Sequence, residues 1–281
     1  MLLSSPRLWV VATPIGNLGD LSPRAREILG KVHTIFAEDT RRALLLCQQC
    51  GITGKHCVSF HDHNEQERQG EALTLLQQGF DVAIVSDAGT PLLADPGYRL
   101  VRACHEAGIA VSPVPGPSAP VAALSAAGLP PLPYTFLGFL PRQAHDQEEL
   151  FLAFADTPTT LVFFDRKDRV LKSLALASRI LGARELAICR ELTKIHEEFI
   201  LGRLDALEQL PVQFQGEMTI LIGPPQQKRR TPVDDVHHIL KTAMTMCSKQ
   251  REAIRLAQKE ICGWNNKELY SLMASLKKEN T

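Results

Sequence analysis

Residues 8–12 read Leu-Trp-Val-Val-Ala, and residues 13–20 continue Thr-Pro-Ile-Gly-Asn-Leu-Gly-Asp. The first run is short and wholly apolar, which is typical of a strand buried on both faces. The second run is rich in glycine and other turn-forming residues. In open α/β sheets, ligands bind in loops that follow the carboxyl ends of the strands. The stretch therefore predicts an α/β fold and its first binding loop.

Short apolar runs of the same kind recur along the first half of the chain. Further apolar runs lie at residues 34–37, 81–86 and 110–114. Stretches with helical spacing of apolar residues separate them, at residues 23–31, 41–50, 65–78 and 98–107. Ser22 and Pro23 form a good cap and first-turn pair for the first of these helices. Strand and helix alternate, so we expect a mainly parallel sheet with helices on both faces.

A proline-rich segment, Pro130-Pro-Leu-Pro133, predicts a domain boundary. Beyond it we expect a second α/β unit with more antiparallel pairing. Its strands are expected at residues 135–137, 160–164, 186–189, 197–201 and 218–222, and its helices at 146–155, 170–181 and 204–209. The predicted domains are residues 1–129, which bind a cofactor, and residues 134–223, which close a cleft.

A polar, proline-containing linker at residues 223–232 precedes a third unit, residues 233–281. Helical spacing recurs there at 234–246, 250–261 and 266–277, with Gly263 in a turn. Residues 228–281 hold 11 Lys/Arg and 6 Asp/Glu, a net charge of +5, whereas residues 1–227 carry a net charge of −5. Short helices with a glycine turn and a basic surplus predict a helix-turn-helix-like module that binds RNA.

The length, the composition and the distribution of apolar residues exclude several classes of protein. No run of 18 apolar residues occurs, so we expect no membrane span. The N-terminal segment lacks the basic region and cleavage site of a signal peptide. Seven cysteines are an odd number in a chain of 281 residues that is large enough to fold without disulfides. Reduced thiols and a cytoplasmic location are therefore expected.

Three loops follow predicted strands: residues 13–20, residues 86–91 leading to 95–97, and residues 115–119. Their small residues allow a ligand to approach the backbone closely. None has the G-x-x-x-x-G-K-[ST] or G-x-G-x-x-G pattern. Each loop alone is most simply a tight turn. Together they predict a site for a small polar ligand that is not held by its phosphates.

A series of short motifs runs in order along the chain. They are Thr13-Pro-Ile-Gly-Asn-Leu18, Ala37-Glu-Asp-Thr-Arg41, His61-Asp-His-Asn-Glu65, Ser86-Asp-Ala-Gly-Thr-Pro91, Asp95-Pro-Gly-Tyr98, Pro115-Gly-Pro-Ser-Ala119, Leu124-Ser-Ala-Ala-Gly-Leu129, Arg190-Glu-Leu-Thr-Lys194, Glu197-Glu198 and Gly216-Glu-Met-Thr-Ile220. From about residue 8 to the end, this series resembles the ribosomal RNA small-subunit methyltransferase I family, a bacterial branch of the tetrapyrrole-methylase superfamily.

The resemblance implies a fold, a reaction and partners. The fold would be two α/β domains with S-adenosylmethionine folded into the cleft between them. The reaction would be methyl transfer to the ribose 2′-hydroxyl of a cytidine in the decoding region of 16S rRNA, in the small ribosomal subunit. Members of the family act as homodimers.

The resemblance also assigns cofactor-binding residues. Pro14 and Gly16 match the family's first cofactor loop. Asp87, Ala88 and Gly89 match the second loop, and Ser118 and Ala119 match the third. Phe164 and the pair Gly216 and Glu217 would close the cleft over the adenine.

The chain departs from the family pattern after the strand that ends at Phe164. The family usually reads Glu-Ser-x-His-Arg there, whereas this chain reads Asp165-Arg-Lys-Asp-Arg169. Asp165 keeps a carboxylate and Arg169 is kept. Arg166 and Asp168 replace the serine and the histidine, so no role in placing RNA carries over from those two side chains.

The methyl group of a sulfonium is already activated, so we expect no metal. A base that accepts the ribose proton would accelerate the transfer. Several candidates remain open: Glu38, Asp39, His61, Asp87, Asp95, Glu191, and Lys194 if its pKa is depressed. The alternative of a zinc site at His61, His63, Cys47, Cys50 and Cys57 is disfavoured because Cys47 and Cys50 lie within a predicted helix.

Basic residues are the candidates for RNA contact: Arg41, Arg42, Arg169, Arg190, Lys249, Arg251, Arg255, Lys259 and Lys267. Simpler interpretations stay open for them. Arg41 and Arg42 could belong to a solvated helix start or contact a dimer partner, Arg190 could form an ion pair, and the C-terminal cations could lie on solvated faces.

Two other functions remain open at this point. One is methylation of a corrin or another tetrapyrrole, which the basic C-terminal unit disfavours. The other is a non-enzymatic RNA-binding protein on the same fold, which the three intact ligand loops disfavour.

Overall fold

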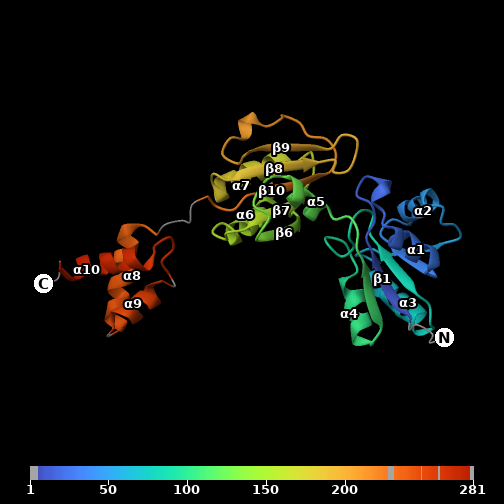
Figure 1. Cartoon of the computed structure of the whole chain (residues 1–281), viewed down its shortest axis with the longest axis horizontal. Helices are drawn as coiled ribbons and strands as arrows, with labels where there is room; N and C mark the ends of the chain where they lie inside the picture. The colour runs from blue at the N-terminus through green and yellow to red at the C-terminus, as the bar shows by residue number, and fades with distance from the viewer. Residues whose placement is uncertain (1–5, 227–230, 248, 259, 279–281) are drawn as a thin grey trace.

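The computed structural model describes residues 6–226, 231–247, 249–258 and 260–278, apart from the side chains of residues 277 and 278. Within that part, two five-stranded sheets and a C-terminal group of helices succeed one another along the chain (Figure 1). In the same part, no helix is both long enough and apolar enough to cross a bilayer. The α/β class predicted from the sequence is confirmed.

The first sheet contains β1 (Arg7–Val11), β2 (Thr34–Ala37), β3 (His56–Ser59), β4 (Val82–Val85) and β5 (Ala110–Val114). Its order is β3-β2-β4-β1-β5, and every neighbouring pair is parallel, as expected. The strand β3 was not predicted from the sequence. This strand lies at the edge of the sheet and buries only Val58, so it lacks the continuous apolar run of the central strands.

Helices cover both faces of the first sheet, because successive strand side chains point to opposite sides. Ile35 packs with Leu29 of α1 (Pro23–Lys31), on the face that α2 (Thr40–Gln49) also covers. Phe36 packs with Leu76 of α3 (Glu65–Gln77), on the face that α4 (Tyr98–Glu106) also covers. The predicted cap of α1 is confirmed, since Ser22 Oγ accepts a 3.0 Å hydrogen bond from the Ala25 amide.

The second sheet contains β6 (Tyr134–Phe139), β7 (Thr160–Asp165), β8 (Glu185–Arg190), β9 (Glu198–Arg203) and β10 (Met218–Ile222). Its order is β6-β7-β10-β8-β9. The β6–β7 pair is parallel and the other pairs are antiparallel, which confirms the expected antiparallel character.

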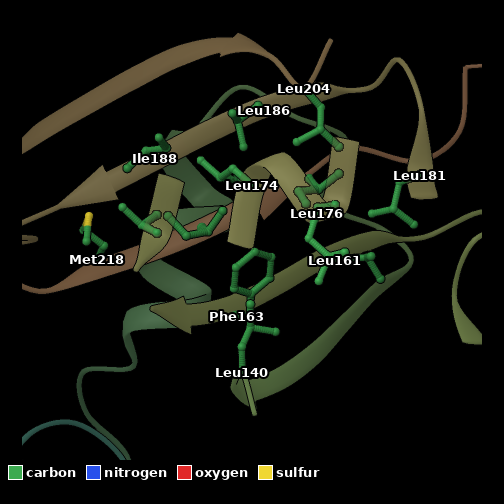
Figure 2. Packing of buried hydrophobic residues seen from close by; sticks show 14 of the residues in the cluster. Leu140, Leu161, Phe163, Leu174, Leu176, Leu181, Leu186, Ile188, Leu204 and Met218 are labelled. Carbon is green, nitrogen blue, oxygen red and sulfur yellow. The ribbon is translucent and has the colours of Figure 1, made fainter. Parts of the chain in front are cut away.

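One face of the second sheet packs against α6 (Ala144–Ala153) and α7 (Val170–Leu181). In Figure 2, Leu174 and Leu176 of α7 lie among side chains of the strands, including Phe163 and Ile188. The helix predicted at 204–209 is wrong apart from a 3-10 turn, η2 (Leu207–Gln209). The Leu204 amide instead bonds to the Arg184 carbonyl at 2.9 Å, which leaves too few residues for a helix before Pro211.

The opposite face of the second sheet is covered by α5 (Ala119–Ala126), which follows the last strand of the first sheet. Ala123 and Leu124 of this helix pack with Val162 and Leu221, and Ile15 from the loop after β1 joins the same cluster. The two sheets are therefore joined by apolar packing. This helix was not predicted from the sequence, because residues 119–126 are apolar on nearly every side and so lack a helical pattern of apolar and polar residues.

The C-terminal group contains α8 (Val233–Met246), α9 (Gln250–Ala257) and α10 (Asn266–Lys278), close to the predicted ranges. Val236, Ile254 and Leu269 are fully or almost fully buried in a cluster made of residues from these helices and the turns between them. Figure 1 shows the group set apart from both sheets. The predicted end of the second helix, at residue 261, is four residues too late. Ile261 is still buried in the cluster, but it follows a turn at Gln258 and Glu260.

Candidate functional site

A cleft of about 690 Å³ lies between the carboxyl ends of the first sheet's strands and the second sheet. Residues that follow β2, β4 and β5 line one wall, and residues of β7, β8 and β10 line the other. This volume falls in the range of small-molecule sites. A second hollow, of about 400 Å³, lies at the amino ends of β1 and β5, next to Pro6 and Ala110. The titratable side chain in the lining of this second hollow is His105. The hollow therefore offers far fewer groups for ligand binding or catalysis than the cleft does.

The loops that follow β1, β4 and β5 are tied to one another. Thr13 and Gly89 exchange backbone hydrogen bonds of 2.9 and 3.1 Å, and Thr90 Oγ1 donates to the Pro117 carbonyl at 3.0 Å. Gly89 has a φ of +84°, and a Cβ there would lie 3.3 Å from Ile15 Cγ2. Glycine is needed because the backbone is left-handed and closely approached. The loops therefore form one continuous wall.

Three carboxylates stand on this wall: Glu38, Asp87 and Asp95. Asp87 Oδ1 accepts a 3.0 Å hydrogen bond from the Asp39 amide, and its Oδ2 lies 3.3 Å from Arg42 Nη1, so Asp87 fixes the start of α2. Burial, helped by the negative charge of Glu38, raises the pKa of Asp95 to about 6. Burial and the charge of Asp87 also raise the pKa of Glu38. Asp95 can therefore exchange a proton near neutral pH.

The opposite wall carries both apolar and charged side chains, and aromatic rings form part of its apolar portion. Phe164 lies at the end of β7, with its ring centroid 5.1 Å from those of Phe136 and Phe139. Phe139, Phe164 and the buried Cys189 line the cleft, and burial raises the pKa of the Cys189 thiol to about 12. Cys189 is thus a neutral apolar group. Aromatic faces on this wall suit a flat ring.

The end of β7 is held by a turn of residues 165–169, here named the Asp165 turn. The Asp165 side chain is fully buried, and its Oδ1 accepts hydrogen bonds from the Arg166 amide at 2.8 Å and from Arg169 Nε. Arg169 also donates to the carbonyls of Leu140 and Pro141 at 2.9 and 3.1 Å. The turn carries Arg166, Lys167 and Asp168 along the cleft wall.

A second tight turn, after β8, contains Glu191 and Thr193 at φ values of 50° and 65°. Glu191 Oε1 accepts from the Glu217 amide at 3.0 Å and from Lys194 Nζ at 3.1 Å. The Glu217 amide lowers the pKa of Glu191. Burial alone would lower the pKa of Lys194, but hydrogen bonds to Glu217 and Glu191 outweigh it and raise the pKa. The condition for Lys194 as a base, a depressed pKa, is therefore not met.

This second turn contacts the loop after β1. A Cβ at Gly16 would lie 2.5 Å from Lys194 Cγ and 2.8 Å from the Leu192 carbonyl oxygen. Gly16 thus lies at the contact between the two sheets, whereas its neighbour Ile15 lines the cleft. Pro14 and Gly16 are absent from the lining.

The cleft brings together most of the residues predicted to bind the cofactor: Asp87, Ala88, Gly89, Ser118, Ala119, Phe164, Gly216 and Glu217. Among the candidate bases, Glu38, Asp87 and Asp95 line it, but Asp39, His61, Glu191 and Lys194 do not. Asp39 caps α2 through the Arg41 amide. The Nδ1 atom of His61 is buried without a hydrogen-bond partner in the described part of the chain.

Several lining residues were missed from the sequence, among them Ile15, Leu93, Phe139, Lys167 and Leu192. Ile15, Lys167 and Leu192 lie within segments that the sequence had singled out, whereas nothing local distinguishes the apolar Leu93 from a core residue. Phe139 did carry a signal, since it ends a strand just before the polar segment that begins at Pro141.

The candidates for RNA contact differ in how free they are. Arg42 lines the cleft, and Arg41 pairs with Asp39. Arg169 is held by Asp165. Arg190 is bound to Glu198 and to the Gln215 carbonyl. In the C-terminal group, the exposed candidates are Lys249, Arg251, Arg255 and Lys267. Lys259 lies outside the described residues.

Among the described residues, no group of three or more His, Cys, Asp or Glu side chains could hold a metal ion.

Comparison with known proteins gives a consistent set of similarities. Residues 7–208 match the family described as Tetrapyrrole (Corrin/Porphyrin) Methylases. Relatives named "Ribosomal RNA small subunit methyltransferase I" include one from Escherichia coli O157:H7, 43% identical over 82% of each chain. Another, from Xylella fastidiosa, is 41% identical over 95% of this chain and 99% of the relative.

The fold has solved relatives as well. The crystal structure of the methyltransferase CobJ superposes with a TM-score of 0.60 at 19% identity, covering 81% of this chain and 98% of that one. A uroporphyrin-III-C-methyltransferase from Thermus thermophilus gives a TM-score of 0.51 at 20% identity, covering 77% and 94%. These likenesses establish a shared fold.

Proposed function

This chain belongs to the tetrapyrrole (corrin/porphyrin) methylase family, and within it to the small-subunit ribosomal RNA methyltransferases I, and from that membership we propose its reaction. The protein transfers a methyl group from S-adenosylmethionine to the ribose 2′-hydroxyl of a cytidine in the decoding region of 16S rRNA. The observation that carries the proposal is similarity at 41% identity along 95% of the chain to a relative named for ribosomal RNA.

The cleft fits S-adenosylmethionine in size and chemistry. Gly89 lines the cleft, and because it has no side chain it leaves room for a ligand beside Ile15. Asp87 offers carboxylate oxygens to an amino or hydroxyl group, and Phe164 offers an aromatic face. Residues 87–89 and 118–119 would hold the amino acid and ribose parts, and Phe164, Gly216 and Glu217 would enclose the adenine. The cofactor supplies a methyl group that is already activated by the sulfonium.

The chain's own contribution is to position the ribose hydroxyl and accept its proton. Among the candidate bases on the wall, Asp95 has a pKa of about 6, so it is ionised at pH 7 yet basic enough to take a proton. We propose Asp95 as the acceptor, with burial and the charge of Glu38 raising its pKa. Alignment of the reacting atoms would supply much of the remaining acceleration.

The other proposals concern partners and organisation. The substrate partner is 16S rRNA or the small ribosomal subunit, met in the cytoplasm by a homodimer. Residues 1–129, 134–223 and 233–281 would act as the cofactor-binding, cleft-closing and RNA-binding units. α5 follows β5 but packs on the second sheet, which supports a crossing between the first two units within the segment after β5.

The decisive experiment is transfer from S-adenosylmethionine with a labelled methyl group to small ribosomal subunits and to naked 16S rRNA. Ribose methylation is then mapped by nuclease or alkaline protection. Label at a 2′-oxygen of a decoding-region cytidine is the expected result. Label on a base, or on an added tetrapyrrole alone, would contradict the proposal.

A further inference from the structure

Two cations stand at the rim of the cleft on the Asp165 turn. Arg166 and Lys167 are both exposed, yet both line the cleft, so their side chains lie where the cleft opens to solvent. Among the described residues, neither of them forms an ion pair. Most other cations near the cleft are paired: Arg42 with Asp87, Arg169 with Asp165, and Lys194 with Glu191 and Glu217.

The backbone that carries these two cations is fixed. Asp165 Oδ1 binds the Arg166 amide, and the amides of Arg169 and Val170 donate to the Arg166 carbonyl at 3.1 and 3.0 Å. Arg169 fastens the turn to the end of β6 through the Leu140 carbonyl. The backbone of Arg166 and Lys167 is therefore already ordered, so less conformational entropy is lost when their side chains bind a ligand.

The distribution of charge decides what they bind. The facing wall holds Glu38, Asp87 and Asp95, so an anion is repelled from the inside of the cleft and attracted to its rim. A polyanion with its backbone at the rim and one nucleoside inside matches this pattern. Arginine binds phosphate through two parallel hydrogen bonds, and lysine binds it as a point charge.

We infer that Arg166 and Lys167 contact the phosphodiester groups flanking the target nucleotide, and so hold the RNA strand at the rim while one ribose enters the cleft. This inference rests on the proposed function. It gives a role to Arg166, one of the two positions at which this chain departs from the Glu-Ser-x-His-Arg pattern of its family. The carboxylate of the cofactor presents the same anionic oxygens, and the test separates the two ligands.

The test uses the full chain with the double substitution Arg166→Ala/Lys167→Ala. Its matched control is Lys172→Ala/Arg179→Ala, which removes two exposed cations from α7, outside the cleft lining. Affinity for a decoding-region RNA is measured at several salt concentrations, and S-adenosylmethionine affinity is measured by calorimetry. The slope of log affinity against log salt should become shallower by about 1.4, from about 0.7 per lost phosphate contact on a single strand.

The expected pattern is a shallower salt slope and a higher KM for RNA in the rim variant, with cofactor affinity unchanged and the control like the wild type. An unchanged slope would overturn the inference. So would a fall in cofactor affinity with an unchanged slope, because the cations would then serve the cofactor carboxylate. Failure of the wild-type protein to methylate ribose would instead count against the proposed function.

Discussion

Gly16 and Lys194 lie in contact across the two sheets, and a Cβ on the glycine would come within 2.5 Å of Lys194 Cγ. The backbone carbonyl of Leu192 and Thr193 Oγ1 approach the same point at 2.8 Å. The lysine side chain could move aside, but the backbone carbonyl cannot without shifting the turn after β8. Ile15 and Leu192, next to these contact points, line the cleft. The width of the cleft therefore depends on a residue without a side chain.

The first prediction follows from this contact. Gly16→Val should push the loop after β1 away from the second sheet, at a cost in stability of about 1–3 kcal/mol from overpacking. We expect a lower melting temperature and S-adenosylmethionine affinity reduced at least about tenfold. Gly30→Ala is the matched control, since a Cβ there meets nothing within 4 Å. Wild-type cofactor affinity in Gly16→Val would show that this contact does not shape the site.

The second prediction concerns Gly89. Its φ of +84° and the proximity of Ile15 mean that Gly89→Val strains the backbone and fills space on the cofactor wall. Calorimetry should detect no cofactor binding. Gly79→Ala has a comparable φ of +96° with no neighbour within 4 Å, so it imposes backbone strain away from the cleft. If both variants lose equal stability and both keep the cofactor, the loop after β4 is not part of the site.

These contacts mark the limit of what the sequence could predict. The strands β1, β2, β4 and β5 were predictable because each contains a short, mainly apolar run. The loops after three of them could be recognised from their small residues. The site depends on more than that: the pKa of Asp95 rises because its carboxyl group is buried and because Glu38, which follows a different strand, lies near it. Nothing local in the sequence indicates which carboxylates meet, since that depends on strand order.

The third prediction is a pH dependence of the reaction. If Asp95 accepts the ribose proton, kcat should rise with pH through about 6, the pKa of its carboxyl group, and then level off. Asp95→Asn should lower kcat by about 10²–10⁴-fold and remove this inflection. Cofactor affinity, measured in parallel, reports whether the variant keeps its site. A variant that is slow but keeps the inflection near pH 6 would exclude Asp95 as the base.

The same shift gives a fourth prediction, for stability. The folded protein holds the pKa of Asp95 above its ordinary value, so folding favours the protonated carboxyl group. The stability that the raised pKa contributes is fully present below the pKa of Asp95 in the unfolded chain, near 4. This stability is lost as the pH rises through about 6, the pKa of Asp95 in the folded protein. Asp95→Asn should therefore melt at a higher temperature than the wild type at pH 7.5, and the difference should vanish near pH 4. A lower melting temperature at both pH values would contradict this account.

The fifth prediction concerns the C-terminal helices. In the part of the chain that the structure describes, their hydrophobic cluster is made of residues between 236 and 276, and the clusters of the two sheets contain none of these residues. A chain that ends at residue 226 should therefore fold and keep wild-type affinity for S-adenosylmethionine.

The same truncation removes the exposed cations Lys249, Arg251, Arg255 and Lys267, which we expect to meet RNA phosphates. RNA affinity should fall and depend less steeply on salt, because fewer counterions are released on binding. The full chain with Arg251→Ala/Arg255→Ala should show the same trend to a smaller extent, which separates loss of charge from loss of the helices. If the truncated protein methylates small subunits as efficiently as the full chain does, these helices do not anchor the RNA.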